Sequence, residues 1–172
     1  EKAQELIPTI CSMTTKKSRF DVYVIEKIKL LERSSNDTEK KLILKLTQFE
    51  LLYLKRDIHH MKPDTLNVLL KDLESIHEEL EHVKMGDVKA ATFVINASLL
   101  RSLGEEEKAA QLFDKAIAIE KEVKYEKQWL ASAAYERGEQ EYYAKNLKRC
   151  YEYMKRSSSY SKYPFEEVIK SR

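Results

Sequence analysis

The sequence predicts an all-helical fold of antiparallel helix pairs, stacked as a tetratricopeptide-like solenoid. Glycine and proline are scarce, with three of each in 172 residues, so few sharp turns and no strands are expected. Between these breakers, apolar residues recur at helical spacing. Gly104 and Gly138 lie 34 residues apart, which is the tetratricopeptide period.

Residues 1–85 are expected to form N-terminal helical hairpins. The apolar spacing predicts helices over residues 1–13, 18–33 and 38–60. A fourth helix is predicted to open at Pro63, since proline suits a first helical turn, and to close at Gly86, since glycine suits a helix end.

Residues 86–156 are expected to hold two tetratricopeptide-like repeats. In the first, Gly104 is the predicted turn, and the small side chains of Ala97 and Ala109 let the paired helices approach while Phe93 and Phe113 fill the space around them. The pattern is moderately specific, because an ordinary bundle of helical hairpins also fits it.

The second repeat follows the pattern less closely. Gly138 is its predicted turn and Ala131 falls at a small position, but Lys127 stands where an aromatic residue is expected, and Trp129 is expected to supply the bulk. Residues 157–172 are predicted to be a linker and a capping helix: Ser157, Ser158 and Ser159 form the connection, and Pro164 starts the helix.

Composition excludes several classes of function. The 31 Lys and Arg nearly cancel the 29 Asp and Glu, which argues against a general binder of polyanions. Only two cysteines, Cys11 and Cys150, are present, too few for a disulfide scaffold. Glu1 in place of Met predicts a fragment of a longer protein, and the chain is expected to be soluble and cytoplasmic, with nuclear or lipid-droplet association as further options.

No catalytic motif is visible, so the protein is predicted not to be an enzyme and to need no cofactor. His77 and His82 resemble a metalloprotease pair but are five residues apart, which turns the rings away from each other on a helix. No metal site is therefore expected.

Four stretches resemble the tetratricopeptide repeat 39 family, which includes the fungal inclusion body clearance protein. They are the segments 17–20 (with Lys27 in the helix that follows), 49–53, 103–104 and 120–125. The resemblance implies the C-terminal part of a helical-repeat adaptor linked to protein clearance and lipid handling, with no catalytic residues. The polar second repeat and the lack of a proline after Trp129 depart from the family pattern.

The predicted function is protein binding on the concave face of the stack, where a helical or extended segment of another protein would lie. The register places the contacts at Ser98, Arg101, Tyr125, Gln128 and Tyr135.

The alternative is a module that binds acidic phospholipid or nucleic acid through basic C-terminal helices, at Lys145, Lys148, Arg149, Lys155 and Arg156. These alternate with tyrosines, a combination that suits phosphate or acidic peptides, although half-buried tyrosines are also ordinary packing residues. Nucleic acid is the less expected ligand, because the net charge of this region is small.

Overall fold

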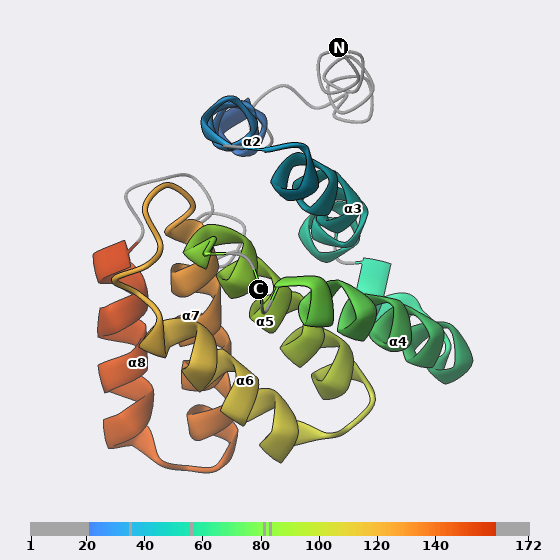
Figure 1. Ribbon diagram of the computed structural model, residues 1–172. Coiled ribbons are helices and arrows are strands. Elements are labelled where there is room, and N and C mark those ends of the chain that lie inside the picture. The colour runs from blue at the N-terminus through green and yellow to red at the C-terminus, as the bar shows by residue number, and fades with distance from the viewer. Residues whose placement is uncertain (1–20, 35, 56, 81, 83, 161–172) are drawn as a thin grey trace.

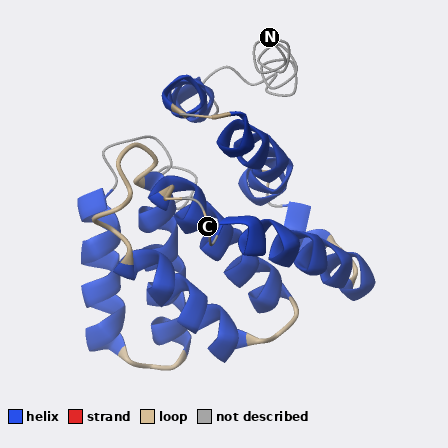
Figure 2. Ribbon diagram, in the orientation of Figure 1, coloured by secondary structure: helices blue, strands red, loops and turns tan. Residues whose placement is uncertain are grey.

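The computed structural model describes residues 21–34, 36–55, 57–80, 82 and 84–160, and within them it contains helices and no strand (Figures 1 and 2). The α-helices are α2 (Asp21–Arg33), α3 (Asp37–Leu54), α4 (Pro63–Leu80), α5 (Gly86–Ser102), α6 (Glu106–Ala118), α7 (Gln128–Tyr143) and α8 (Leu147–Tyr160). This confirms the predicted all-helical class. The helices predicted at residues 1–13 and from Pro164 lie outside the described residues.

Helix α3 begins where the sequence supplies a cap. The Asn36 side chain accepts a hydrogen bond of 2.9 Å from the Glu39 backbone N–H, satisfying one of the free donors of the first turn. Leu42, Leu46 and Phe49, which are spaced by four and three residues along this helix, are buried. The helix predicted over 38–60 is in fact two elements, because α3 ends at Leu54 and a short 3₁₀ helix, η1, covers Asp57–His60.

Gly86 does not close α4 as predicted. Helix α4 ends at Leu80, and Gly86 is the first residue of α5. A Cβ atom at Gly86 would lie 2.4 Å from the backbone oxygen of Glu122. Glycine is needed here because the loop between α6 and α7 passes directly over the start of α5.

Helices α5 and α6 form the predicted hairpin. Gly104 has a φ of +83° and forms the turn, and the Glu105 N–H donates to the Leu100 carbonyl at 2.9 Å, which closes the last turn of α5. Ala97 and Ala109 are fully buried. This hairpin therefore has the predicted turn and buries both of the predicted small residues.

The second hairpin, α7 with α8, turns at a different place from the one predicted. Gly138 is buried inside α7, where a Cβ atom would lie 2.8 Å from the Met154 side chain, so it serves close packing against α8. The turn is at Lys145, with a φ of +61°. The 34-residue spacing of Gly104 and Gly138 is thus not the spacing of the two turns.

The predicted linker at residues 157–159 is the last turn of α8. Helix α8 continues to Tyr160, and the buried Ser157 hydroxyl donates to the Ala131 carbonyl of α7 at 2.8 Å. This bond gives a polar side chain a partner within the hairpin, so the run of serines does not interrupt the helix.

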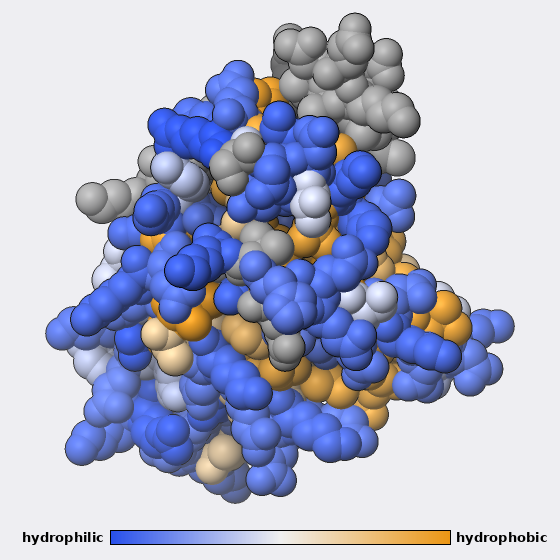
Figure 3. All heavy atoms as spheres, viewed as in Figure 1, coloured by the Kyte–Doolittle hydropathy of each residue, from blue (hydrophilic) through white to orange (hydrophobic). Residues whose placement is uncertain are grey.

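Helix α5 is the centre of the core. It contacts α3, α4, α6 and α7, while α7 also packs against α6 and α8 packs against α7. Helix α2 lies beside α3 (Figure 1) and contacts it through Lys27 and Glu50. On the face shown in Figure 3, the outer surfaces are mostly hydrophilic and the hydrophobic residues show mainly between helices. None of the helices in the described part of the chain is long and apolar enough to cross a membrane.

Candidate partner-binding surface

Two of the five residues predicted to bind a partner are not on the surface. Ser98 is 1% exposed and Gln128 is 5% exposed. Helix α5 is surrounded by four other helices, so the face that a solenoid would leave open is covered here. Ser98 and Gln128 therefore cannot contact a partner in this fold, and this part of the prediction is wrong.

Tyr125 and Tyr135 are partly exposed, and both are already engaged. The Arg33 guanidinium of α2 lies 4.4 Å from the centre of the Tyr125 ring. Tyr135 also has interactions within the chain. The Tyr125 ring thus contributes to holding α2 in place, since a cation over a ring face is attracted by the ring quadrupole.

Arg101 joins the ends of three helices. Its guanidinium pairs with Glu136, with Glu139 at 3.0 Å and with Glu106 at 3.4 Å. Burial alone would lower the pKa of Arg101, but Glu136 and Glu139 more than compensate and raise it. The side chain is a structural cation that ties α5 to α6 and α7, although it also lines a cavity.

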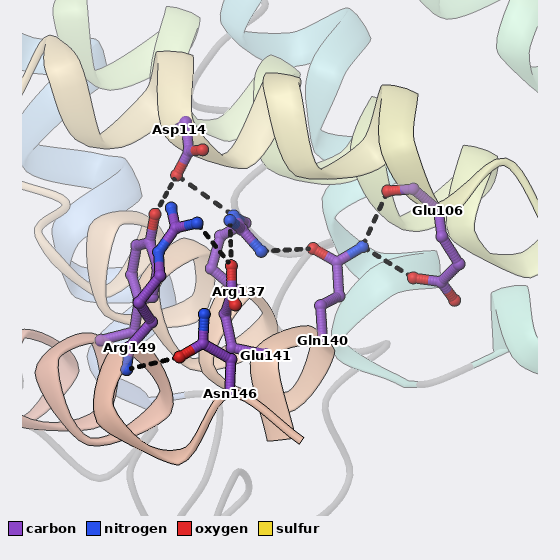
Figure 4. A network of polar contacts seen from close by, with 8 residues as sticks. Glu106, Asp114, Arg137, Gln140, Glu141, Asn146 and Arg149 are labelled. Carbon is purple, nitrogen blue, oxygen red and sulfur yellow. Dashed lines mark hydrogen bonds and ion pairs between the residues drawn. The ribbon is translucent and has the colours of Figure 1, made fainter. Parts of the chain in front are cut away.

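A second guanidinium, that of Arg137, lies in a neighbouring network (Figure 4). It donates to Glu141 at 2.8 Å and to Asp114 at 3.2 Å. It also donates to the Gln140 side-chain oxygen at 3.4 Å, and the Gln140 amide donates to the Glu106 carboxylate at 2.7 Å. The network therefore joins α7 to α6 at two places, at Asp114 and at Glu106 in the first turn of α6.

Tyr153 connects this network to α8. Its hydroxyl donates to Asp114 at 2.8 Å, and the Arg137 guanidinium lies 4.8 Å from its ring centre. Arg149, also on α8, pairs with Glu141 at 3.4 Å. The side chains at this end of α6, α7 and α8 are therefore held by several polar contacts each.

Two cavities, here together called the acidic hollow, open beside these networks. Their volumes are about 530 and about 570 Å³, and Arg101, Glu106 and Tyr143 line both. The first also includes His59, His60 and Glu139, and the second Glu107 and Glu141. Their shared lining makes them one continuous hollow at the ends of α5, α6 and α7.

Next to the hollow, large side chains are exposed at the tip of the α7–α8 hairpin. The exposed fractions are 59% for Tyr142, 72% for Tyr143, 65% for Leu147 and 68% for Tyr151. We call these four residues the tyrosine platform. The Tyr142 and Tyr143 rings are in contact, with centroids 5.7 Å apart, and Leu147 and Tyr151 share one face of α8 because they are four residues apart.

The sequence indicates this platform only in part. The C-terminal tyrosines stood out because they alternate with basic residues, but packing in the last helices was the preferred explanation. For Tyr153 and Tyr160, which are partly buried against the core, that explanation is correct. For the three platform tyrosines it is wrong: Tyr142 and Tyr143 lie next to the turn at Lys145, and Tyr151 lies on an exposed face of α8.

The predicted basic patch is exposed but partly neutralised. Lys145, Lys148, Arg149, Lys155 and Arg156 are all exposed. However, Arg149 pairs with Glu141, and Arg156 pairs with Glu120 at 3.2 Å. The positive charge available to a polyanion is therefore smaller than the sequence indicates.

The most unusual charged group is buried elsewhere. The Lys27 ammonium of α2 lies 2.9 Å from Glu50 of α3 and 2.9 Å from Glu126 of the α6–α7 loop, and all three side chains are buried. Desolvation by burial raises the pKa of Glu126 to about 7, partly countered by Lys27 and reinforced by Glu50. We call these residues the Lys27 triad.

The loop that carries Glu126 is held by one carboxylate. Asp87, in the first turn of α5, accepts hydrogen bonds from the backbone N–H groups of Lys124, Tyr125 and Glu126, at 3.2, 2.8 and 2.7 Å. This fixes Glu126 against Lys27. Because the triad is enclosed, its role is to position α2 and the loop, and it offers no surface to a ligand.

The histidines are not gathered into a metal site. The His77 ring packs on Phe93, with centroids 5.1 Å apart. Among the residues that the structure describes, no group of three or more His, Cys, Asp or Glu is arranged to hold a metal ion.

In comparisons with known proteins, no family model, no curated protein and no solved structure matches this chain. The resemblance to the tetratricopeptide repeat 39 family therefore stays a prediction.

Proposed function

We propose that this chain is a non-catalytic adaptor of helical-hairpin type, and that it binds a segment of another protein at the tyrosine platform and the adjoining acidic hollow. The observation that carries the proposal is the platform itself. Four large side chains, each more than half exposed, gather at one tip, whereas the other large apolar residues in the described part are mostly buried. Contiguous exposed patches of this kind mark interaction sites.

The chemistry of the platform suits a protein partner. Tyrosine is enriched at interfaces because its ring contributes large apolar area while its hydroxyl stays hydrogen-bonded. Covering a ring that exposes about 100 Å² contributes roughly 2–3 kcal/mol before the costs of association. Two or three such rings can therefore anchor an interface whose surrounding contacts offset the remaining cost of association.

The scaffold behind the platform supports the repeat-type interpretation. The α5–α6 and α7–α8 hairpins end their first helices with the same hydrogen-bond pattern, and they pack side by side. In this proposal the partner lies at the hairpin tip and not on the concave face, because the α5 residues that would line that face are buried.

A quantitative pull-down from cell extract, using the whole chain as bait, tests the proposal. One variant carries Tyr143→Ser and Tyr151→Ser in the platform, and a matched variant carries Lys148→Glu and Lys155→Glu on the basic side of α8. We expect a reproducible set of proteins that the platform variant loses and the basic variant keeps. Loss in the basic variant alone, with steep salt dependence, would support the lipid or nucleic-acid alternative instead.

A further inference from the structure

The acidic hollow holds more negative than positive charge. Its walls and the networks behind them contain six carboxylates, those of Glu106, Glu107, Asp114, Glu136, Glu139 and Glu141, and three guanidinium groups, those of Arg101, Arg137 and Arg149. The chain as a whole carries a formal charge of +2. The hollow is thus a local region of opposite sign on a slightly basic protein.

Two of the three guanidinium groups, those of Arg101 and Arg137, are committed to internal contacts, whereas the Glu106 and Glu107 carboxylates remain on the open side. Arg101 and Arg137 each contact at least two carboxylates and are largely buried. Glu106 is 57% exposed, and Glu107 is exposed as well. A ligand that enters the hollow therefore meets carboxylate oxygens first, which favours a cation and repels an anion.

The hollow and the tyrosine platform are continuous. Tyr143 belongs to the platform and also lines both cavities of the hollow. Its exposed ring can receive a cation on its face. Cavities of about 530 and 570 Å³ also leave room for a long side chain.

We propose that the partner segment carries a basic residue followed by apolar residues. The Lys or Arg side chain enters the acidic hollow past Tyr143, and the apolar residues cover the tyrosine platform. This inference rests on the proposed adaptor function and names the chemistry of its partner. Complementary charge selects the basic residue, and the exposed rings of Tyr142, Tyr143 and Tyr151 select its apolar neighbours.

Fluorescence polarisation with short labelled peptides tests this inference on the whole chain. The probe is a capped octapeptide, Gly-Ser-Arg-Ser-Leu-Phe-Ser-Gly, and two control peptides replace its Arg by Glu or its Leu-Phe by Ser-Ser. The first protein variant is Glu106→Gln with Glu107→Gln. Its matched control is Glu74→Gln with Glu78→Gln, two exposed carboxylates on α4.

We expect the Arg peptide to bind, with an affinity about threefold to tenfold lower for the Glu106→Gln, Glu107→Gln variant, as two exposed charge pairs would give. The α4 variant should bind as the wild type does, and both control peptides should bind more weakly. The melting temperature of each variant shows that the fold is kept, and the salt dependence of wild-type binding is a second readout.

Three results would overturn the inference. They are equal binding of the Arg and Glu peptides, no binding of the Arg peptide at millimolar concentration, and concentration-dependent self-association of the chain that Tyr143→Ala removes. If the platform variant loses its protein partners while the Glu106→Gln, Glu107→Gln variant keeps them, the adaptor function stands and only the basic character of the partner is wrong.

Discussion

Gly104 and Lys145 occupy the same position in the same helix-ending motif. Each has a positive φ, +83° and +61° respectively. The residue after each, Glu105 or Asn146, donates a hydrogen bond to the carbonyl five residues earlier, of Leu100 or Glu141, at 2.9 and 2.8 Å. The two hairpins therefore turn alike, although only one of them uses the residue that a left-handed backbone favours.

Exchanging the residue type at these two positions should change stability in opposite directions. Lys145→Gly removes the strain of a left-handed lysine and should stabilise the fold by up to about 1 kcal/mol, whereas Gly104→Ala should destabilise it by about 1 kcal/mol. Urea unfolding followed by circular dichroism measures both changes. A destabilised Lys145→Gly variant would show that this turn differs from the one at Gly104.

The other two glycines, Gly86 and Gly138, both pack closely against a neighbouring element. At Gly86 the neighbour is backbone, and at Gly138 it is a flexible side chain. A Cβ atom at Gly86 would meet the Glu122 backbone oxygen, whereas at Gly138 it would meet the end of the Met154 side chain. We expect Gly86→Ala to cost about 1–3 kcal/mol. Gly138→Ala should cost much less, because Met154 can move and alanine favours the helix. Equal losses in thermal unfolding would contradict this reasoning.

These positions show how far the sequence determines the fold. Apolar spacing predicted α2, α3 and α4. Gly104 was identified correctly as the turn between α5 and α6, because a glycine between two amphipathic segments usually ends a helix. The same rule failed at Gly138, since a glycine can also sit inside a helix where a neighbour approaches closely. Lysine has no preference for a left-handed turn, so the sequence does not indicate a turn at Lys145, and the turn of the second hairpin was predicted at the wrong residue.

The candidate site was less predictable than the fold, for a related reason. The exposure of Tyr143 and Leu147 depends on where the second hairpin turns, and the burial of Ser98 depends on the helices that surround α5. The Lys27 triad unites residues from α2, α3 and a distant loop, which no local pattern connects. Arg101 was predicted to contact a partner, but it pairs within the chain with three carboxylates from two other helices, which no local pattern connects to it.

Removing the cation of the Lys27 triad should strongly destabilise the protein. Lys27→Met leaves the buried carboxylates of Glu50 and Glu126 close together without the Lys27 ammonium, which should cost about 3–5 kcal/mol at pH 8. The same substitution at the exposed Lys41 of α3 should change stability by no more than about 0.5 kcal/mol. The free energies of unfolding in urea compare the two, and similar small losses would mean that the triad does not hold α2.

Because of Glu126, the free energy of unfolding should fall as the pH rises from about 5 to 7. The folded protein keeps the Glu126 proton up to a pKa of about 7, while the ordinary value is 4.5. Between these values the folded state binds more protons, so stability should fall as the pH rises through this window, by at most about 1.4 kcal/mol per pH unit. Over the same range Lys27 stays protonated, since its pKa is raised.

Glu126→Gln isolates this effect, because other carboxylates titrate in both proteins. The difference in unfolding free energy between variant and wild type should change steadily in favour of the variant from pH 5 to pH 8. A difference that does not vary with pH would show that Glu126 does not take up a proton on folding in this range.

The central claim is that partners bind at the tyrosine platform, and hydroxyl-radical footprinting of the chain, free and bound to a protein recovered in the pull-down, tests it most directly. Exposed tyrosines react, so their modification rates report coverage residue by residue. We expect strong protection of Tyr142, Tyr143 and Tyr151 in the complex, with the buried Trp129 and Phe113 unchanged as internal references. Unchanged rates at all three platform tyrosines, with protection at Tyr125 and Tyr135 instead, would contradict it.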